Sequence, residues 1–308
     1  MLSAGAARRY SHVGSAIGCG MLLAACTHQP RPLGELVLDA ADPVIQVRVA
    51  GVPLRLRVDL DRYDGVELDP GAAARLPLAF EPGSDLEVGR IHLPGSVATA
   101  TLVLGDVTLP VQLVRHARDC CAGADGAIGP ALLPYAAVRW RRADAPRPGG
   151  SVNLPLDEDA VHGLSAAGAA GVRLRFALGL ESSSATAAAG AVLWQAQGGR
   201  WDGPPSTIAT AFGLVRPARS IAFARPATLA GFRFDALPVR IADFGGGAAL
   251  PQDPRRPDEI LVSRAVRSQE AWPAVTIGQD RLRACAEIVY TARPRTLTLR
   301  CAFSPWPG

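Results

Sequence analysis

The sequence contains no lysine, so all 32 of its basic residues are arginine. These arginines are dispersed along the chain, and aromatic residues make up only 6% of it. Surfaces that bind nucleic acid usually carry a dense basic patch, often with aromatic side chains that stack on bases. Because the sequence has no such run and its formal net charge is only +4, we expect no nucleic-acid partner.

Long uninterrupted segments are also missing. The 26 prolines and 32 glycines are spread over the whole length and divide it into short pieces, which favours strands and turns over long helices. With 308 residues the chain can bury a substantial core, and two domains are the natural expectation. No apolar run reaches the roughly 20 residues that a membrane span needs. We also expect no cofactor.

The first 26 residues differ from the rest of the chain. Two arginines form a positively charged start, a short apolar stretch follows, and a small-residue segment ends at Cys26. This order predicts a secretory signal peptide over residues 1–26. The segment Leu-Ala-Ala-Cys at 23–26 resembles the bacterial lipobox, in which the cysteine is lipidated and becomes the first residue of the mature chain. An ordinary signal peptide with a chance cysteine is the alternative.

The lipobox resemblance implies where the protein resides. A lipidated Cys26 would hold the body of the chain at a membrane through a tether of residues 27–43. Thr27, rather than aspartate, follows the cysteine, which is similar to bacterial lipoproteins of the outer membrane. The resemblance thus implies a protein of the bacterial cell envelope, lipid-anchored to the outer membrane and facing the periplasm. Residues 8–10 (Arg-Arg-Tyr) also resemble a twin-arginine signal, so the export route stays open.

Four cysteines remain outside the signal segment: Cys120, Cys121, Cys285 and Cys301. Export would place them where disulfides persist. The segments after Cys285 and before Cys301 alternate like the two arms of a hairpin, which sets these cysteines opposite each other and predicts a bridge. Cys120 and Cys121 are then a vicinal pair or free thiols. A metal site built from His116 and these two cysteines lacks a second ligand pair at zinc-like spacing.

Two parts of the chain present similar signals in the same order. In residues 44–140 and again in 172–290, a strand pair precedes an Ala-rich stretch, a strand with a Leu-Pro-Val core, and a hydrophobic-hydrophobic-Gly turn. A tandem of about 120 residues is too long for a solenoid repeat and suits two copies of one β domain. We therefore expect domains at 44–156 and 172–308, a linker at 157–171, and a cleft between the domains.

These motifs resemble the aspartic-protease superfamily in its retropepsin-like and pepsin-like forms. Each lobe of that family carries a strand ending in Asp-Thr-Gly, with a later hydrophobic-hydrophobic-Gly turn packed beneath it. Arg57–Asp61 with Asp125–Leu133 fits this pattern once, and Phe176–Ser183 with Val275–Leu282 fits it again. The resemblance covers nearly all of residues 44–301. It implies an all-β fold of two pseudo-symmetric aspartic-protease-like lobes, each a double-psi barrel, with a cleft between them.

The resemblance fails at the catalytic triplets. The family's chemistry needs two carboxyl groups about 3 Å apart that share one proton. Asp59 keeps one acid, but Leu60 and Asp61 stand where the family has Thr and Gly. We read the second triplet as residues 179–181 (Gly-Leu-Glu), which has no acid at its first position. We therefore expect that proteolysis has been lost and that the cleft binds a peptide or another extended ligand.

Two other functions stay open. An active aspartic-type endopeptidase would need an unusual acid pair, formed by Asp59 or Asp61 with Glu181 across the cleft. A structural envelope protein would use the same scaffold only for contacts with other proteins. The separation between these carboxyl groups in the folded chain distinguishes the first alternative from the others.

The remaining candidates lack the sequence context that their chemistry requires. Asp202 does not directly follow an apolar strand, as a catalytic aspartate of this family would. Ser182–Ser184 has no Gly-x-Ser-x-Gly elbow and no suitably placed histidine. Three histidines are expected to be surface or loop residues: His92, His116 and His162.

Overall fold

The structure is a computed structural model that describes residues 32–62, 65–88, 91–121, 123–159, 163–243, 250 and 272–303. The expected signal segment with Cys26, and His162, lie outside the described residues. The described part is mostly β with few helices, which confirms the expected fold class at this level. None of its helices combines the length and the apolar character needed to cross a membrane.

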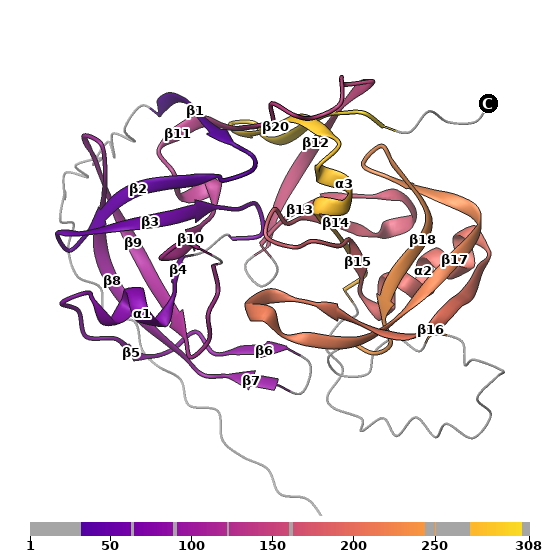
Figure 1. Ribbon diagram of the computed structural model, residues 1–308, viewed down its shortest axis with the longest axis horizontal. Coiled ribbons are helices and arrows are strands. Elements are labelled where there is room, and N and C mark those ends of the chain that lie inside the picture. The colour runs from indigo at the N-terminus through magenta and orange to yellow at the C-terminus, as the bar shows by residue number, and fades with distance from the viewer. Residues whose placement is uncertain are drawn as a thin grey trace, which may run out of the picture. The chain divides into compact units, whose positions relative to one another are not determined.

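One sheet closes on itself as a barrel of six strands (Figure 1). In sheet order its seven strands are β2 (Val44–Val49), β3 (Val52–Val58), β10 (Gly126–Ile128), β4 (Val66–Leu68), β9 (Val107–His116), β8 (Gly95–Leu104) and β5 (Glu81–Pro82). The additional pairing of β2 with β8 closes the ring. Ile45, Val47 and Val49 of β2 are buried and alternate with more exposed residues, as the period of two in a strand requires.

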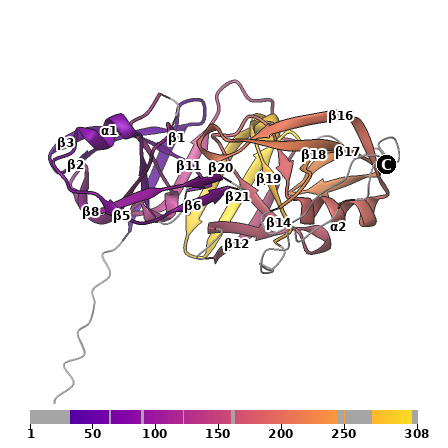
Figure 2. The same ribbon diagram turned by 90° about the horizontal axis from the view of Figure 1, so that it is seen from below.

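The larger sheet has twelve strands, and Figure 2 shows three of them, β12, β20 and β21, side by side. Its order is β1 (Leu33–Asp39), β11 (Tyr135–Arg141), β20 (Cys285–Ala292), β21 (Arg295–Cys301), β12 (Gly150–Asp159), β13 (Gly163–Ala167), β14 (Arg173–Phe176), β19 (Ala274–Ile277), β15 (Ser184–Ala185), β18 (Phe232–Arg240), β17 (Val215–Leu229) and β16 (Gly199–Ala209). This sheet therefore takes strands from both parts of the proposed sequence repeat.

Helices are short, and two of them begin at a capping side chain. Asp69 caps α1 (Pro70–Ala74), and Thr186 caps α2 (Ala187–Gln197) by accepting a hydrogen bond from the Ala189 N–H at 3.1 Å. The other short elements are α3 (Gln279–Leu282), the 3-10 turns η1 (Pro130–Leu132), η2 (Ala169–Gly171) and η3 (Ala211–Gly213), and the hairpin β6 (Leu86–Val88) with β7 (Ile91–Leu93).

The same pairing scheme occurs twice. Strand β3 pairs in parallel with β10, β10 pairs antiparallel with β4, and β4 pairs in parallel with β9. Strands β14, β19, β15 and β18 repeat the same sequence of parallel, antiparallel and parallel pairings. The turn motif Asp125–Gly129 contains β10, and Ala274–Gly278 contains β19. The two motifs therefore occupy corresponding positions, as their sequence similarity predicts.

Two segments differ from their expected roles. The stretch 157–171, expected as a linker, contains β13, which pairs antiparallel with β12 and places Leu156 opposite Ala166. The expected tether, residues 27–43, contains β1, which pairs in parallel with β11. Both segments have polar or small residues that resemble a linker in sequence. Their backbone groups nevertheless satisfy their hydrogen bonds by extending the large sheet.

Both expected cysteine pairs are disulfide-bonded. Cys285 and Cys301 lie opposite each other in the β20–β21 hairpin, with a Cα–Cα distance of 3.7 Å, which confirms the predicted bridge. Cys120 and Cys121 form a vicinal disulfide, so the alternative of free thiols does not hold in this structure. Disulfides of this kind persist in oxidising compartments.

Removing the Cys285–Cys301 bridge by the double substitution Cys285→Ser and Cys301→Ser should lower the free energy of unfolding by about 3 kcal/mol, because a long closed loop restricts the unfolded chain. Denaturant unfolding measures this change. Cys120→Ser with Cys121→Ser is the matched control and should cost much less, since its closed loop contains almost no chain. Equal losses from the two variants would contradict the prediction.

Candidate functional site

Asp59 is the first residue after β3 and is almost completely buried. Its N–H donates to the carbonyl of Ile128 in β10 at 3.0 Å, which continues the pairing of these two strands. Its Oδ1 accepts a hydrogen bond from the N–H of Leu178, 2.8 Å away. Beside it, the buried Trp140 donates from Nε1 to the carbonyl of Val58 at 3.2 Å. Asp59 therefore joins the end of β3 to the loop that follows β14.

Ala177 is the counterpart of Asp59 in the second copy of the pairing scheme. Phe176, the last residue of β14, pairs with Ile277 just as the last residue of β3 pairs with β10. The next N–H, that of Ala177, donates to the carbonyl of Ile277 at 3.1 Å, in the same way as the N–H of Asp59 donates to β10. The second copy therefore carries a methyl group where the first carries a carboxyl group.

The expected register of the second triplet is wrong by two residues. We expected the triplet at 179–181, whereas the strand pairing places it at 177–179 (Ala-Leu-Gly). The apolar residues after Phe176 look like a continuation of the strand, although the pairing of β14 ends there. The second triplet lacks an acid in either register.

Gly179 lies directly against the Asp59 carboxyl group. A Cβ atom built on Gly179 would come within 2.9 Å of Oδ2 of Asp59, closer than Cβ atoms normally approach another heavy atom. Any larger residue at this position would push the carboxyl group or the loop away. Gly179 is the counterpart of Asp61, so the second triplet keeps a glycine at its third position while the first does not.

Burial raises the pKa of the Asp59 carboxyl group to about 7, and the negative charge of Asp61 adds to this rise. The hydrogen bond from Leu178 and the positive charge of Arg62 oppose it. Arg62 lies close to Asp61, with 3.7 Å between Nε and Oδ1. Asp59 therefore holds its proton to a much higher pH than an ordinary aspartate does.

Glu181 does not form an acid pair with Asp59 or Asp61 in the described part of the structure. Its side chain is 77% exposed and forms an ion pair with Arg283. The three carboxyl groups do border the same cavity. Of the other two, the charge of Asp61 contributes to the raised pKa of Asp59, and both of these aspartates belong to the loop after β3.

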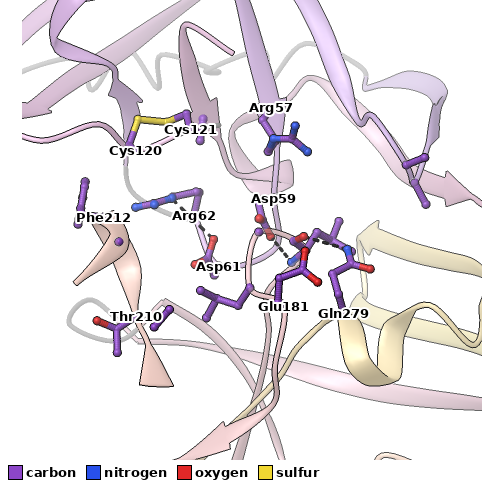
Figure 3. Close-up of a pocket in the computed structure, with 18 of the residues that line it drawn as sticks. Arg57, Asp59, Asp61, Arg62, Cys120, Cys121, Glu181, Thr210, Phe212 and Gln279 are labelled. Atoms are coloured by element: carbon purple, nitrogen blue, oxygen red, sulfur yellow. Dashed lines mark hydrogen bonds and ion pairs between the residues drawn. A yellow bond between two sulfur atoms is a disulfide. The ribbon is translucent and has the colours of Figure 1, made fainter. Parts of the chain in front are cut away.

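A cavity of about 460 Å³ opens above Asp59 (Figure 3). In the figure, Asp61, Arg62 and the vicinal disulfide lie on one side of Asp59, while Glu181 and Gln279 lie on the other. The lining comes from segments far apart in the sequence. It consists of Ala40, Ala41, Arg57, Asp59, Asp61, Arg62, Cys120, Cys121, Ala127, Arg142, Leu178, Gly179, Leu180, Glu181, Ala209, Thr210, Phe212, Gly213, Gln279 and Arg283.

Gln279 connects two sides of the cavity. Its Nε2 donates to the carbonyl of Leu178 at 2.9 Å, and its Oε1 accepts a hydrogen bond from Arg142 at 3.3 Å. Because the N–H of Leu178 donates to Asp59, a chain of hydrogen-bonded groups runs from Arg142 to the buried carboxyl group. Gln279 is buried, so its amide orients the groups on both sides of it.

Phe212 lines the cavity on the side away from Gln279 (Figure 3). It lies in η3, between β16 and β17, and the guanidinium of Arg62 stacks over its ring at 5.2 Å from the centroid. The ring of His116 contacts the same phenyl group edge to face at 4.8 Å. Phe212 also packs in an apolar cluster against which Cys120 lies. This wall therefore combines an aromatic ring, an arginine and the vicinal disulfide.

His116 is not a surface residue, contrary to expectation. It is 5% exposed, and its two ring nitrogens lie 2.9 Å from Oε1 of Glu67 and 2.9 Å from the carbonyl of Ser84. Burial raises the pKa of Glu67, and the hydrogen bond and charge of His116 oppose that rise. Among the described residues, no cluster of three or more His, Cys, Asp or Glu side chains could hold a metal ion. His116 thus closes the end of β9 with two hydrogen bonds.

The other candidates have structural roles or lie elsewhere. Ser183 is buried; its hydroxyl donates to Asp280 at 2.7 Å and accepts from the N–H of Gly278 at 3.0 Å, which ties α3 to the preceding loop. His92 is half exposed and lies 3.4 Å from Asp85. Asp202 lies on β16, outside the cavity lining.

Most of the cavity lining was not predicted from the sequence, including the side chains of Arg57, Arg142, Phe212 and Gln279. Arg57 could have been found, because it precedes Asp59 by two positions and alternate residues of a strand share a face. Gln279 directly follows the second turn motif. Nothing local marks Arg142 or Phe212, which reach the cavity only through the pairing of distant strands. A comparison of the chain with known protein families and with curated protein sequences finds no match.

The raised pKa of Asp59 predicts how stability depends on pH. Because the carboxyl group binds its proton more tightly in the folded than in the unfolded chain, its contribution to stability falls as pH rises from about 4 to 7. Relative to the wild type, Asp59→Asn should therefore become progressively more stable over this range, by about 1.4 kcal/mol for each unit of pKa difference. Urea unfolding at pH 4, 6 and 8 measures the change.

Asp125→Asn is the control with the opposite sign. Burial acts to raise the pKa of Asp125, but hydrogen bonds from the Arg55 N–H and the Arg75 side chain outweigh it and lower the pKa below its usual value. Its contribution to stability is therefore lost as pH falls through that lowered pKa. A wild-type to Asp59→Asn difference that does not vary with pH would show that Asp59 is not held in a protonated form.

Proposed function

We propose that this chain has an aspartic-protease-like fold that has lost proteolysis and that binds a peptide or another extended ligand in the cavity above Asp59. The repeated pairing scheme supports the relationship, because each copy holds a strand that ends at the cavity, with a hydrophobic-hydrophobic-Gly turn beside it. The two pseudo-symmetric lobes with a cleft between them are part of this proposal. The observation that carries it is Ala177, which stands where a second catalytic aspartate would be required.

The loss of proteolysis rests on two independent features. A single carboxyl group cannot share a proton with a partner and so cannot both activate water and protonate a peptide carbonyl. Leu60 and its counterpart Leu178 also lack the hydroxyl groups that hold the two acids in register in the family that the chain resembles. The displaced pair with Glu181 is disfavoured, because Glu181 is exposed and engaged by Arg283.

The cavity supports binding rather than a purely structural role. Its volume of about 460 Å³ lies in the range of small-molecule and short-peptide sites. It offers an aromatic wall at Phe212, backbone groups of the loop at Leu178, and several charged side chains. A concave site that combines apolar surface with converging polar groups is typical of ligand sites.

The purified protein should bind peptides without cleaving them. We expect no cleavage of an unfolded protein substrate between pH 3 and 7, in the wild type or in Ala177→Asp, because that variant restores one acid but neither hydroxyl. Fluorescently labelled peptides, capped at both ends, should bind. Ala41→Trp, at the exposed rim of the cavity, should weaken binding by about tenfold or more, since a bulky side chain there occupies the ligand's space.

Ala74→Trp, on the exposed face of α1 and outside the cavity, is the matched control and should leave peptide affinity unchanged. Acid-dependent cleavage that disappears in Asp59→Asn or Glu181→Gln would instead establish an active endopeptidase. Absence of peptide binding, or equal effects of the two tryptophan variants, would reject the cavity as the ligand site.

We also propose that the protein is anchored by lipid on Cys26 in the bacterial cell envelope, at the outer membrane and facing the periplasm. The lipobox-like segment at residues 23–26 and the two disulfides support this location. Cys26→Ala should move the protein out of the detergent-soluble membrane fraction or leave its precursor uncleaved, whereas Cys26→Ala protein that fractionates like the wild type would refute the anchor.

A further inference from the structure

The cavity wall carries more positive than negative charge. Four arginines line it, Arg57, Arg62, Arg142 and Arg283, against three carboxyl groups, those of Asp59, Asp61 and Glu181. The excess grows when Asp59 is protonated, which occurs near neutral pH. A cavity with this balance attracts an anionic rather than a cationic group.

Two of these arginines already have a carboxylate partner inside the cavity. Arg62 lies 3.7 Å from Asp61, and Arg283 pairs with Glu181. Arg57 lies 3.7 Å from Asp42, a residue with a 60% exposed side chain. Long ion pairs of this kind with exposed partners contribute little. The pair of Arg57 with Asp42 therefore leaves the positive charge of the cavity only partly compensated.

Arg142 is different, because it has no carboxylate partner among the described residues. Its Nε–H is buried and donates to no partner among those residues, and one of its two terminal nitrogens donates a long hydrogen bond, 3.3 Å, to Oε1 of Gln279. A guanidinium has five N–H donors in a planar fork that matches a carboxylate. Leaving the buried Nε–H of this group without a partner is unfavourable. The geometry therefore presents a cation that lacks its anion.

We propose that the cavity recognises a carboxylate of its ligand, held by Arg142 beside Gln279, and that the ligand is a peptide bound through its free C-terminus. This inference rests on the proposed function, since it names the part of the ligand that the cavity selects. A carboxylate is preferred over a phosphate dianion, because Asp61 and Glu181 border the same space and repel a second negative charge. A side-chain carboxylate offers the same chemistry, and the experiment separates the two sources.

The hydrogen-bonded chain from Arg142 through Gln279 and Leu178 couples the bound carboxylate to Asp59. Protonation of Asp59 removes a negative charge from the same cavity, so binding strengthens as pH falls from 8 to 6. The other charged groups around Asp59 are Asp61 and Arg62 in its own loop, Arg57 on β3, Arg175 on β14, and Glu181 with Arg283 beyond it. Burial raises the pKa of Asp59 to about 7, which lies within this range.

The test compares one set of N-acetylated, fluorescently labelled hexapeptides in three forms: free C-terminus, amidated C-terminus, and amidated C-terminus with an internal glutamate. Affinities of the purified full chain are measured by fluorescence anisotropy at pH 6 and pH 8. We expect the free-carboxylate form to bind at least about tenfold more tightly than the amidated form, as for a charge-assisted bidentate pair. We also expect its affinity at pH 6 to exceed that at pH 8 by about threefold or more, and Asp59→Asn to abolish this dependence.

Arg142→Gln should remove the preference for the free C-terminus, so that the free and the amidated peptides bind this variant with equal affinity. Arg141→Gln is the matched control, because Arg141 is the sequence neighbour, pairs with Glu287 and does not line the cavity. Arg142→Lys keeps the charge without the fork and should retain only part of the preference. Arg142→Lys replaces Arg142→Gln as the test variant if circular dichroism shows that Arg142→Gln does not fold.

The outcomes are distinct. Equal binding of free and amidated peptides, or a preference that survives both substitutions of Arg142, overturns the inference and leaves the proposed function intact. Tighter binding of the internal-glutamate form than of the free C-terminus overturns the C-terminal assignment. Competition by inorganic phosphate at lower concentration than acetate overturns the carboxylate class. Absence of binding by all three forms rejects the proposed function itself.

Discussion

The hydrogen bond from the Leu178 N–H to the Asp59 carboxyl group is the contact on which the site depends. It joins the loop after β3 to the loop after β14, so the ends of the two repeated pairing schemes meet at one side chain. The backbone of Gly179 also approaches this carboxyl group closely, which is possible only because glycine has no side chain. This approach likewise brings the two loops together at Asp59. Burial at this junction raises the pKa of Asp59, so the group keeps its proton to a much higher pH than an ordinary aspartate does.

This junction supports the proposed function, in which the cavity binds a ligand without cleaving it. In the first copy of the pairing scheme the acid is retained, while in the second copy Ala177 takes its place and Gly179 makes room for the acid opposite. One carboxyl group cannot perform the two proton transfers of peptide hydrolysis. The cavity around it remains open, and its walls come from segments that only the complete fold brings together.

The sequence was sufficient where a signal is local. Alternation predicted the strands around the first acid, and the spacing of Cys285 and Cys301 predicted their bridge, because hairpin register follows directly from the pattern of the two arms. The prediction from the sequence was wrong where one residue pattern fits two different structures. The apolar residues after Phe176 extend the strand pattern beyond its true end, and the register of the second triplet therefore came out two residues late. The segments that contain β1 and β13 looked like linkers, since their burial depends on neighbours that are distant in the sequence. Arg142 and Phe212 could not be assigned to the cavity for the same reason.

The most direct test of a single, isolated acid is a carbon-13 NMR titration of the aspartate carboxyl groups between pH 3 and 9. The account predicts that Asp59 titrates near pH 7, that Asp61→Asn lowers its pKa by removing a neighbouring negative charge, and that Glu181→Gln leaves it unchanged. A pKa of Asp59 that shifts when Glu181 is neutralised, or two linked titration steps shared by these residues, would show an acid pair across the cavity and contradict the account.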